Sequence, residues 1–135
     1  MLDVETGRLL HWNAGHDAPM HRSTAVRSLD CAGGGPPLCV IEDFDYAPDT
    51  VDLAPGDLLV LYTDGISEAV NPAGEQYGRE RLRALIEAAP AGCAARDLAQ
   101  RIRDDLGRFA GEAEQADDIT LLVVRWRGPG AVSAR

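Results

Sequence analysis

The chain contains no lysine: all 13 of its basic residues are arginines, against 22 acidic residues, and its formal net charge is −9. Proteins that bind nucleic acid through its phosphates need a stripe of basic side chains. No such stripe is visible in this sequence, which argues against a nucleic-acid partner. The acidic balance suits cation binding, but the solubility of an acidic surface is a simpler account of it.

Cysteine is scarce, and long apolar runs are absent. Cys31, Cys39 and Cys93 are an odd number without CxxC spacing, which argues for a reducing compartment and against a zinc site or a disulfide framework. We predict that Cys39 is a buried, inert thiol. No segment has the length of a membrane span, and the first residues lack the basic and apolar regions of a signal peptide. We therefore expect a cytoplasmic protein without a membrane partner.

The 135 residues suffice for one domain with a sizeable core. Alternating and helical apolar spacing predicts a hairpin over residues 2–5 and 8–12, strands over 20–29, 50–53, 58–62 and 119–124, and helices over 79–89 and 94–109. Polar, glycine and proline clusters predict loops at 13–19, 33–37, 71–74 and 111–116. We expect residues 128–135 to be a disordered tail. This order of elements predicts an α+β layered domain.

The apolar run from Leu58 to Tyr62 is the most informative segment, because it ends abruptly in Asp64 and Gly65. An unbroken apolar strand needs cover on both faces. Glycine at its end permits either unusual backbone angles or a close approach of another chain segment. Asp117 and Asp118 stand directly before the last apolar run. Two such strands can bring their acids together over the core.

Converging carboxylates with no lysine nearby are what hard divalent cations such as Mg²⁺ and Mn²⁺ prefer. Ordinary explanations exist for each part. An Asp-Gly pair is most often only a turn, and an acidic pair before a strand is more often a solvated loop. The residues alone therefore leave both a metal site and a plain turn open.

Four motifs occur in order along the chain. They are Asn13-Ala14-Gly15-His16, Gly35-Pro36-Pro37-Leu38, the stretch from Leu53 to Ala69, and Asp117-Asp118-Ile119-Thr120. Together they resemble the bacterial branch of the metal-dependent type 2C (PPM) serine/threonine phosphatases, which includes stage II sporulation protein E and the sigma-factor regulator phosphatases. The likeness covers roughly residues 2–126.

The resemblance implies a PPM phosphatase-like β-sandwich flanked by helices, with two Mn²⁺ or Mg²⁺ ions between its sheets. Metal-activated water would hydrolyse phosphoserine or phosphothreonine on a regulatory protein such as an anti-anti-sigma factor. By motif, Asp64, the carbonyl of Gly65, and Asp117 are metal ligands. Glu68 and Asp118 are assigned to the outer shell or to the second metal.

The resemblance also places Asn13 and His16 in a shared motif, for which we favour packing and hydrogen bonding over catalysis. Cys39 stands where the family pattern has glycine. The family's earlier Gly-Asp-Val-x-Gly-His-Gly type motif, whose aspartate bridges both metals, has no counterpart in this chain. We therefore expect residues 1–127 to be a partial phosphatase domain, its C-terminal portion. Its exposed sheet edges would favour dimerisation or other association.

Two alternatives remain beside a catalytic domain. A truncated or pseudo-phosphatase domain would act as a non-catalytic interaction module, which the missing bridging aspartate favours. Phosphotransfer receivers and dehalogenase-like phosphatases also place acids at strand ends. In those folds a nucleophilic acid lies early in a chain of alternating strands and helices with a parallel sheet. The strand-rich start of this sequence does not supply it.

Overall fold

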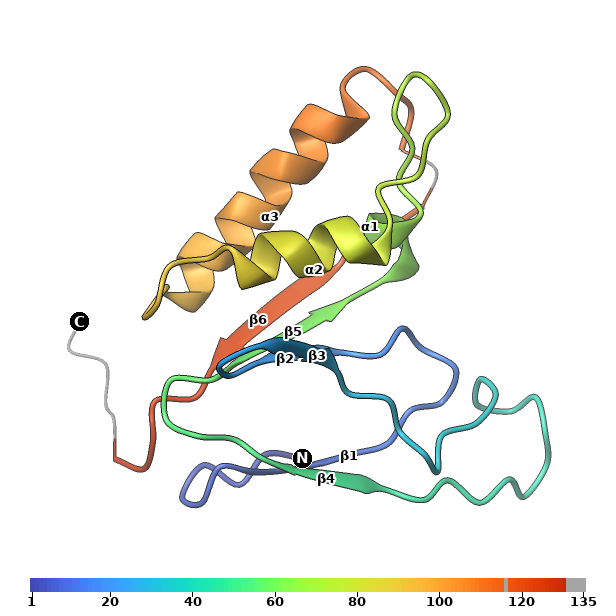
Figure 1. Ribbon diagram of the computed structural model, residues 1–135. Coiled ribbons are helices and arrows are strands. Elements are labelled where there is room, and N and C mark those ends of the chain that lie inside the picture. Colours follow the sequence, from blue (N-terminus) through green and yellow to red (C-terminus); the bar gives the residue numbers. More distant parts are fainter. Residues whose placement is uncertain (116, 131–135) are drawn as a thin grey trace.

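The structure is a computed structural model that describes residues 1–115 and 117–130. It has three layers: a small sheet, a larger sheet and a pair of helices (Figure 1). The strands are β1 (Arg8–His11), β2 (Met20–Arg22), β3 (Val26–Ser28), β4 (Asp49–Asp52), β5 (Leu58–Tyr62) and β6 (Leu121–Arg125). The helices are α1 (Asp64–Ser67), α2 (Arg79–Glu87) and α3 (Ala95–Ala110). The predicted α+β class is confirmed.

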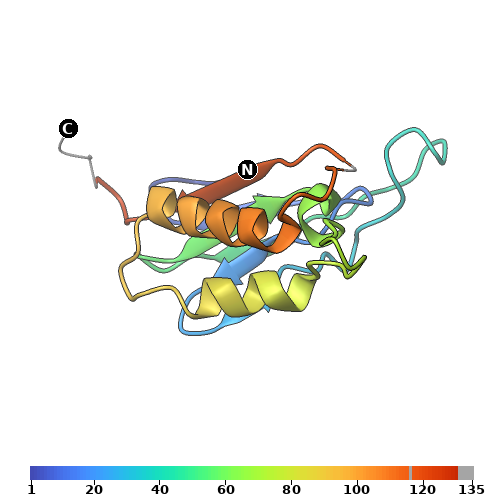
Figure 2. The same cartoon turned by 90° about the horizontal axis from the view of Figure 1, so that it is seen from above.

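All strand pairs within the two sheets are antiparallel. β1 pairs with β4, and the larger sheet has the order β3-β2-β5-β6. Helix α3 packs against β6, and α2 packs against β2 and β3, so the two helices lie side by side over one face of the larger sheet (Figure 2). Among the described residues, no helix is long and apolar enough to cross a membrane.

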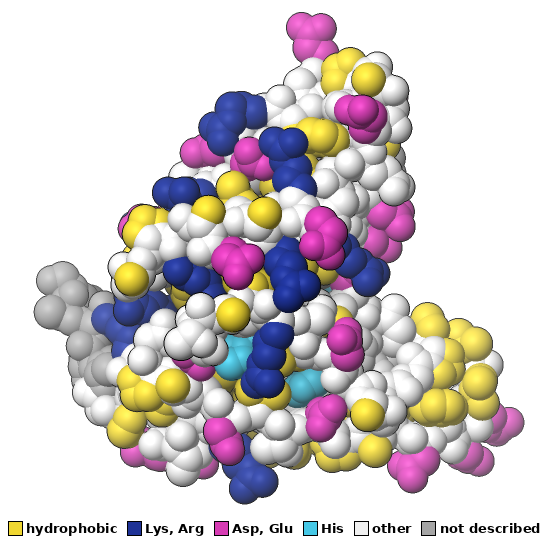
Figure 3. Space-filling view, in the orientation of Figure 1, with side chains coloured by type: hydrophobic (Ala, Val, Ile, Leu, Met, Phe, Trp, Pro, Cys, Tyr) yellow, Lys and Arg dark blue, Asp and Glu magenta, His cyan; other side chains and the backbone are white. Residues whose placement is uncertain are grey.

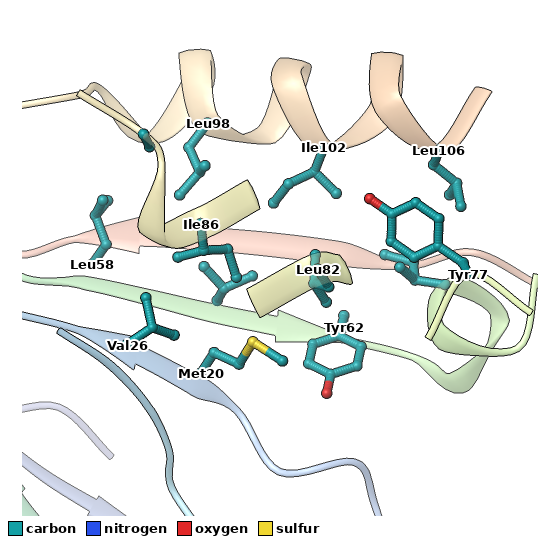
Figure 4. Close-up of a cluster of buried hydrophobic side chains, with 13 residues drawn as sticks. Met20, Val26, Leu58, Tyr62, Tyr77, Leu82, Ile86, Leu98, Ile102 and Leu106 are labelled. Atoms are coloured by element: carbon teal, nitrogen blue, oxygen red, sulfur yellow. The ribbon is translucent and has the colours of Figure 1, made fainter. Parts of the chain in front are cut away.

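Strand β5 is covered on both faces, as its unbroken apolar sequence predicts. Leu58, Val60 and Tyr62 belong to a core between the larger sheet and the helices, and Val60 is fully buried. Leu59 faces the other way, into a smaller core shared with the two-stranded sheet. Figure 4 shows the helical contribution to the first core, made by Leu82, Ile86, Leu98, Ile102 and Leu106. These positions carry the helical spacing seen in the sequence.

A buried polar pair anchors the turn that leads into β5. Nε2 of His21 donates to Oδ2 of Asp57 at 2.7 Å, and both residues are buried. Arg27 Nε donates to Nδ1 of His21 at 3.2 Å, so the imidazole carries its proton on Nε2. The same Asp57 oxygen accepts the backbone N–H of Ala54 at 3.0 Å. These bonds satisfy polar groups whose burial would otherwise be costly.

A second polar cluster joins α3 to the start of α2. Asp105 accepts hydrogen bonds from the Tyr77 hydroxyl at 2.8 Å and from Nε of Arg81 at 2.8 Å. The Arg81 guanidinium also lies over the rings of Tyr77 and Phe109, at 5.2 and 4.9 Å from their centroids. Charge-assisted hydrogen bonds and cation–π contacts therefore fix how the two helices are placed.

We expect Asp105 to make stability depend on acid pH. The hydrogen bond from Arg81 is the main cause that lowers the pKa of Asp105 below its usual value of 3.8. Such a carboxyl contributes stability that is complete above its usual pKa and is lost as the pH falls through its folded pKa. Asp105→Asn should therefore cost about 1–3 kcal/mol near neutral pH, and its deficit against the parent should shrink below pH 3.8.

Urea unfolding near neutral pH and near pH 3 measures this deficit. The control is Asp104→Asn, the same substitution at the neighbouring, exposed residue. That variant should stay close to the parent at both pH values. A deficit for Asp105→Asn that is the same at both pH values would contradict the lowered pKa of Asp105 and its role in stability.

Three local predictions were wrong. The segment 20–29 forms two strands, because Ser23 and Ala25 pair in a tight turn between β2 and β3. Residues 2–5 do not form a full strand: the Asp3 carboxylate accepts the N–H groups of Glu5 and Thr6 and bends the chain. Cys39 is exposed rather than buried. Residue 116 of the predicted loop and residues 131–135 of the predicted tail lie outside the described residues.

Cys39 has a backbone φ of 68°, in the left-handed region that favours glycine. The resemblance places glycine at this position, and a left-handed backbone conformation is a physical reason for that preference. A residue with a Cβ loses about 1–2 kcal/mol in that conformation, and the greater freedom of glycine in the unfolded chain offsets part of it.

We expect Cys39→Gly to raise the free energy of unfolding by about 1 kcal/mol. Cys39→Ala keeps the Cβ and removes only the thiol, so it should match the parent. Urea unfolding of the three proteins measures both effects. Equal stability of the glycine and alanine variants would show that the left-handed conformation carries no measurable cost.

Candidate metal centre

The two predicted acidic segments meet at one edge of the larger sheet. Asp64 opens α1 directly after β5, and Asp117 and Asp118 precede β6, which pairs with β5 so that Tyr62 lies opposite Leu121. Because antiparallel neighbours place the end of one strand beside the start of the other, the two acidic segments come together. The sequence prediction of this convergence is confirmed for the backbone.

Gly65 is the contact point between the two segments. A Cβ on Gly65 would lie 2.4 Å from the carbonyl oxygen of Asp118 and 3.4 Å from that of Asp117. Gly65 is buried and has no positive φ. Of the two reasons for a glycine here, the structure therefore supports close approach rather than unusual backbone angles.

Thr63 holds the same segments together and was missed from the sequence. Its Oγ1 donates to the carbonyl of Asp118 at 2.9 Å and accepts the N–H of Thr120 at 2.9 Å. Its own N–H donates to the carbonyl of Thr120 at 3.1 Å. One side chain thus connects the end of β5 to the acidic segment. The only signal in the sequence was a hydroxyl residue between the strand and its acid.

The carboxylates themselves are exposed. One oxygen of Asp64 accepts the N–H of Gly65 at 3.0 Å, and one oxygen of Asp117 accepts the N–H of Asp118 at 2.6 Å. Gly65, Glu68 and Asp117 line a hollow of about 530 Å³ between α1, α3 and the loop before β6. Asp64 and Asp118 are not among the described residues that line it.

The donor set fits a hard divalent cation in part. Carboxylate and carbonyl oxygens are the ligands that Mg²⁺ and Mn²⁺ prefer, and Mg²⁺ is usually held by one or two carboxylates while it keeps several waters. Within residues 1–115 and 117–130, no group of three or more His, Cys, Asp or Glu side chains is placed to hold a metal ion. The described residues could therefore supply part of a coordination shell, but they do not form a closed cage.

Asn13 and His16 close a loop on each other. The side chain of Asn13 donates to the carbonyl of His16 at 2.8 Å and accepts the N–H of His16 at 2.8 Å. The ring Nδ1 of His16 bonds to the carbonyl of Asp17 at 3.0 Å. These bonds support the structural role that we predicted for both residues.

Asp17 links this loop to the acidic edge, and sequence analysis did not identify it. Its Oδ2 accepts the hydroxyl of Ser67 at 3.1 Å, and its Oδ1 pairs with Arg79. The Asp17 side chain is only 10% exposed, so the ion pair is shielded on that side. Ser67 closes α1, the short helix that Asp64 opens. Asp17 therefore holds α1 against the Asn13–His16 loop.

The sequence model of the family described as Stage II sporulation protein E (SpoIIE) matches residues 1–127. The chain belongs to the SpoIIE family. The phosphoserine phosphatase RsbU of Bacillus subtilis is 30% identical over 124 residues, which are 91% of this chain and 36% of RsbU. Protein IcfG of Synechocystis is 28% identical over 125 residues, 92% of this chain and 19% of IcfG.

Solved structures of the SpoIIE phosphatase domain from Bacillus subtilis share the fold. One, described as a PP2C phosphatase domain with a fragment of the regulatory domain, has a TM-score of 0.73 at 22% identity, over 92% of this chain and 35% of that one. Another, presoaked with manganese, has a TM-score of 0.71 at 18% identity, over 100% of this chain and 57% of that one. The chain spans well under half the length of the two curated relatives, RsbU and IcfG.

We expect Gly65→Ala to separate the two acidic segments. The added methyl group would meet the Asp118 carbonyl, a backbone atom that cannot move without shifting the segment. A loss of about 1–3 kcal/mol in the free energy of unfolding should follow. The measurement is urea unfolding.

The matched control is Gly107→Ala on α3, where a Cβ meets nothing within 4 Å. Alanine is the better helix former, so that variant should gain up to about 1 kcal/mol. Parent-like stability of Gly65→Ala would show that the two segments can part at no cost.

Proposed function

We propose that this chain carries part of the catalytic centre of a PP2C-type protein serine/threonine phosphatase. The observation that carries the proposal is the contact of Gly65 with Asp118, which sets Asp64 and Asp117 at one edge of the sheet. Membership of the SpoIIE family and the likeness to a named phosphoserine phosphatase support it.

In this proposal Asp64, Asp117 and the carbonyl of Gly65 would hold a Mn²⁺ or Mg²⁺ ion, with Glu68 and Asp118 orienting water or serving a second ion. A bound divalent cation supplies a Lewis acid that activates water and neutralises charge on the transferred phosphoryl group. The chain's own contribution is orientation. A backbone N–H holds one oxygen of Asp64 and another holds one oxygen of Asp117, which limits how each carboxylate can turn.

The exposed position of these acids suits a macromolecular substrate. All four acidic side chains of the centre are exposed, so phosphoserine or phosphothreonine on the surface of a folded protein can reach them. By analogy with RsbU and SpoIIE, the substrate would be a phosphorylated regulator such as an anti-anti-sigma factor. Three points stay predictions. Residues 1–127 form a partial phosphatase domain, this part is the C-terminal portion of that domain, and the protein is cytoplasmic.

A second candidate is a non-catalytic interaction module. Leu122 on β6, the last strand in the order of the larger sheet, is 53% exposed, and the described carboxylates do not form a closed metal cluster. An apolar strand at a sheet margin is a site for association with another chain.

Hydrolysis of p-nitrophenyl phosphate in the presence of Mn²⁺ separates the two candidates. A catalytic chain should lose activity about 100-fold or more in Asp64→Asn, while Asp104→Asn, an exposed acid on α3, should keep it. Hydrolysis that is equal in the parent and in Asp64→Asn would refute the proposed catalytic role.

A further inference from the structure

A loop between β3 and β4 carries a concentrated apolar tip. Its residues 36–45, here called the acidic loop, extend beyond the two sheets (Figure 1). Leu38 is 68% exposed, Val40 65% and Ile41 53%. Single exposed apolar residues are ordinary, but three within four positions form a contiguous patch of the kind that marks interaction sites. Figure 3 shows apolar side chains gathered at this margin of the molecule.

The base of the acidic loop is well packed, so its projection is built into the fold. The Tyr46 hydroxyl donates to the carbonyl of Pro36 at 2.7 Å, and the rings of Phe44 and Tyr46 lie 4.7 Å apart. The Phe44 ring covers Gly35 so closely that a Cβ there would lie 2.1 Å from a ring carbon. The aromatic side chains of Phe44 and Tyr46 pack together at the base, whereas the aliphatic side chains at the tip of the loop face solvent.

Charge is distributed unevenly along the chain. Residues 28–78 contain ten acidic and no basic side chains, so this segment accounts for the whole net charge of −9. Glu42, Asp43 and Asp45 lie within the acidic loop, beside the apolar tip. A surface that combines exposed aliphatic side chains with uncompensated carboxylates is complementary to a basic segment with an apolar anchor.

The acidic loop is connected to the candidate metal centre. At its base the Gly35 N–H donates to the carbonyl of Asn13 at 3.0 Å, and Ala14 forms a bridge with Gly35. The Asn13–His16 loop in turn meets α1 through Asp17 and Ser67. In Figure 1 the acidic loop projects from the end of the molecule at which β5 runs into α1.

We propose that the acidic loop is a docking surface for the phosphorylated protein substrate, which it binds through a basic segment that carries an apolar side chain. This proposal rests on the proposed function, because it assigns the partner as substrate. A second copy of the chain is disfavoured because two acidic loops repel each other. An anionic lipid surface is disfavoured for the same reason.

The test measures binding with two fluorescent phosphoserine peptides by anisotropy, without divalent metal, so that the metal centre does not hold the phosphate. One peptide flanks the phosphoserine with arginines and leucines, and the other has glutamate in place of each arginine. The basic peptide should bind about tenfold tighter or more, and its affinity should fall as salt is added.

Variants locate the contact. Leu38→Ser combined with Val40→Ser should weaken binding of the basic peptide about tenfold. The control is Val4→Ser, which changes a valine that is 63% exposed in the turn before β1 and should leave binding unchanged. Glu42→Gln with Asp45→Asn should reduce the salt dependence.

Equal binding of the two peptides, or full binding by the Leu38→Ser, Val40→Ser variant, would overturn the proposal. So would a dimer in light scattering that this variant abolishes, because the patch would then be occupied by a second copy. Hydrolysis of p-nitrophenyl phosphate is measured on the same proteins. Peptide binding without hydrolysis would refute the proposed catalytic function and leave a docking surface whose partner is not a substrate. Hydrolysis without loop-dependent binding would refute the docking surface alone.

Discussion

The burial of both faces of β5 is the constraint on which the rest of this structure depends. Leu58, Val60 and Tyr62 need the helices on one side, and Leu59 needs the small sheet on the other. Three layers follow from this single strand. Because its interior is apolar and covered on both sides, its first polar residues appear only where it ends, at the rim of the sheet. The acidic centre is therefore a consequence of how the core is built.

At that rim, backbone contact matters more than the carboxylates themselves. The exposed acids make few bonds of their own, whereas Gly65 and Thr63 bring the two acidic segments together through carbonyl and amide groups. Asp17 adds a third connection, from the Asn13–His16 loop to α1. A cation held here would thus be supported by Thr63 and Asp17, which are not among its proposed ligands, and outer contacts of this kind tune metal sites.

The chain also distributes its charge unevenly along the sequence. Helices α2 and α3 carry arginine and acid in mixture, whereas residues 28–78, which include the acidic loop, β4, β5 and α1, contain ten acidic side chains and no arginine. A concentration of negative charge favours both a divalent cation and a basic protein segment. Asp64 and Glu68 of the proposed centre and the acidic loop therefore belong to the same acidic segment, although different residues carry the two sites.

The sequence by itself determined most of the elements and suggested the candidate site. Periodicity located both long helices and β5, because apolar spacing reports directly which face is buried, and the ordered motifs pointed to Asp64, Gly65 and Asp117 as candidate ligands. Only the tertiary structure decided which contacts hold these residues in place. Asp17 and Thr63 are ordinary loop and strand-end residues in one dimension, and their partners lie 50 and 55 positions away. Local pattern carries no information about such distant hydrogen bonds, nor about the turn that splits 20–29 or the exposure of Cys39. Those features depend on how separate segments pack, and packing is settled only when the chain has folded.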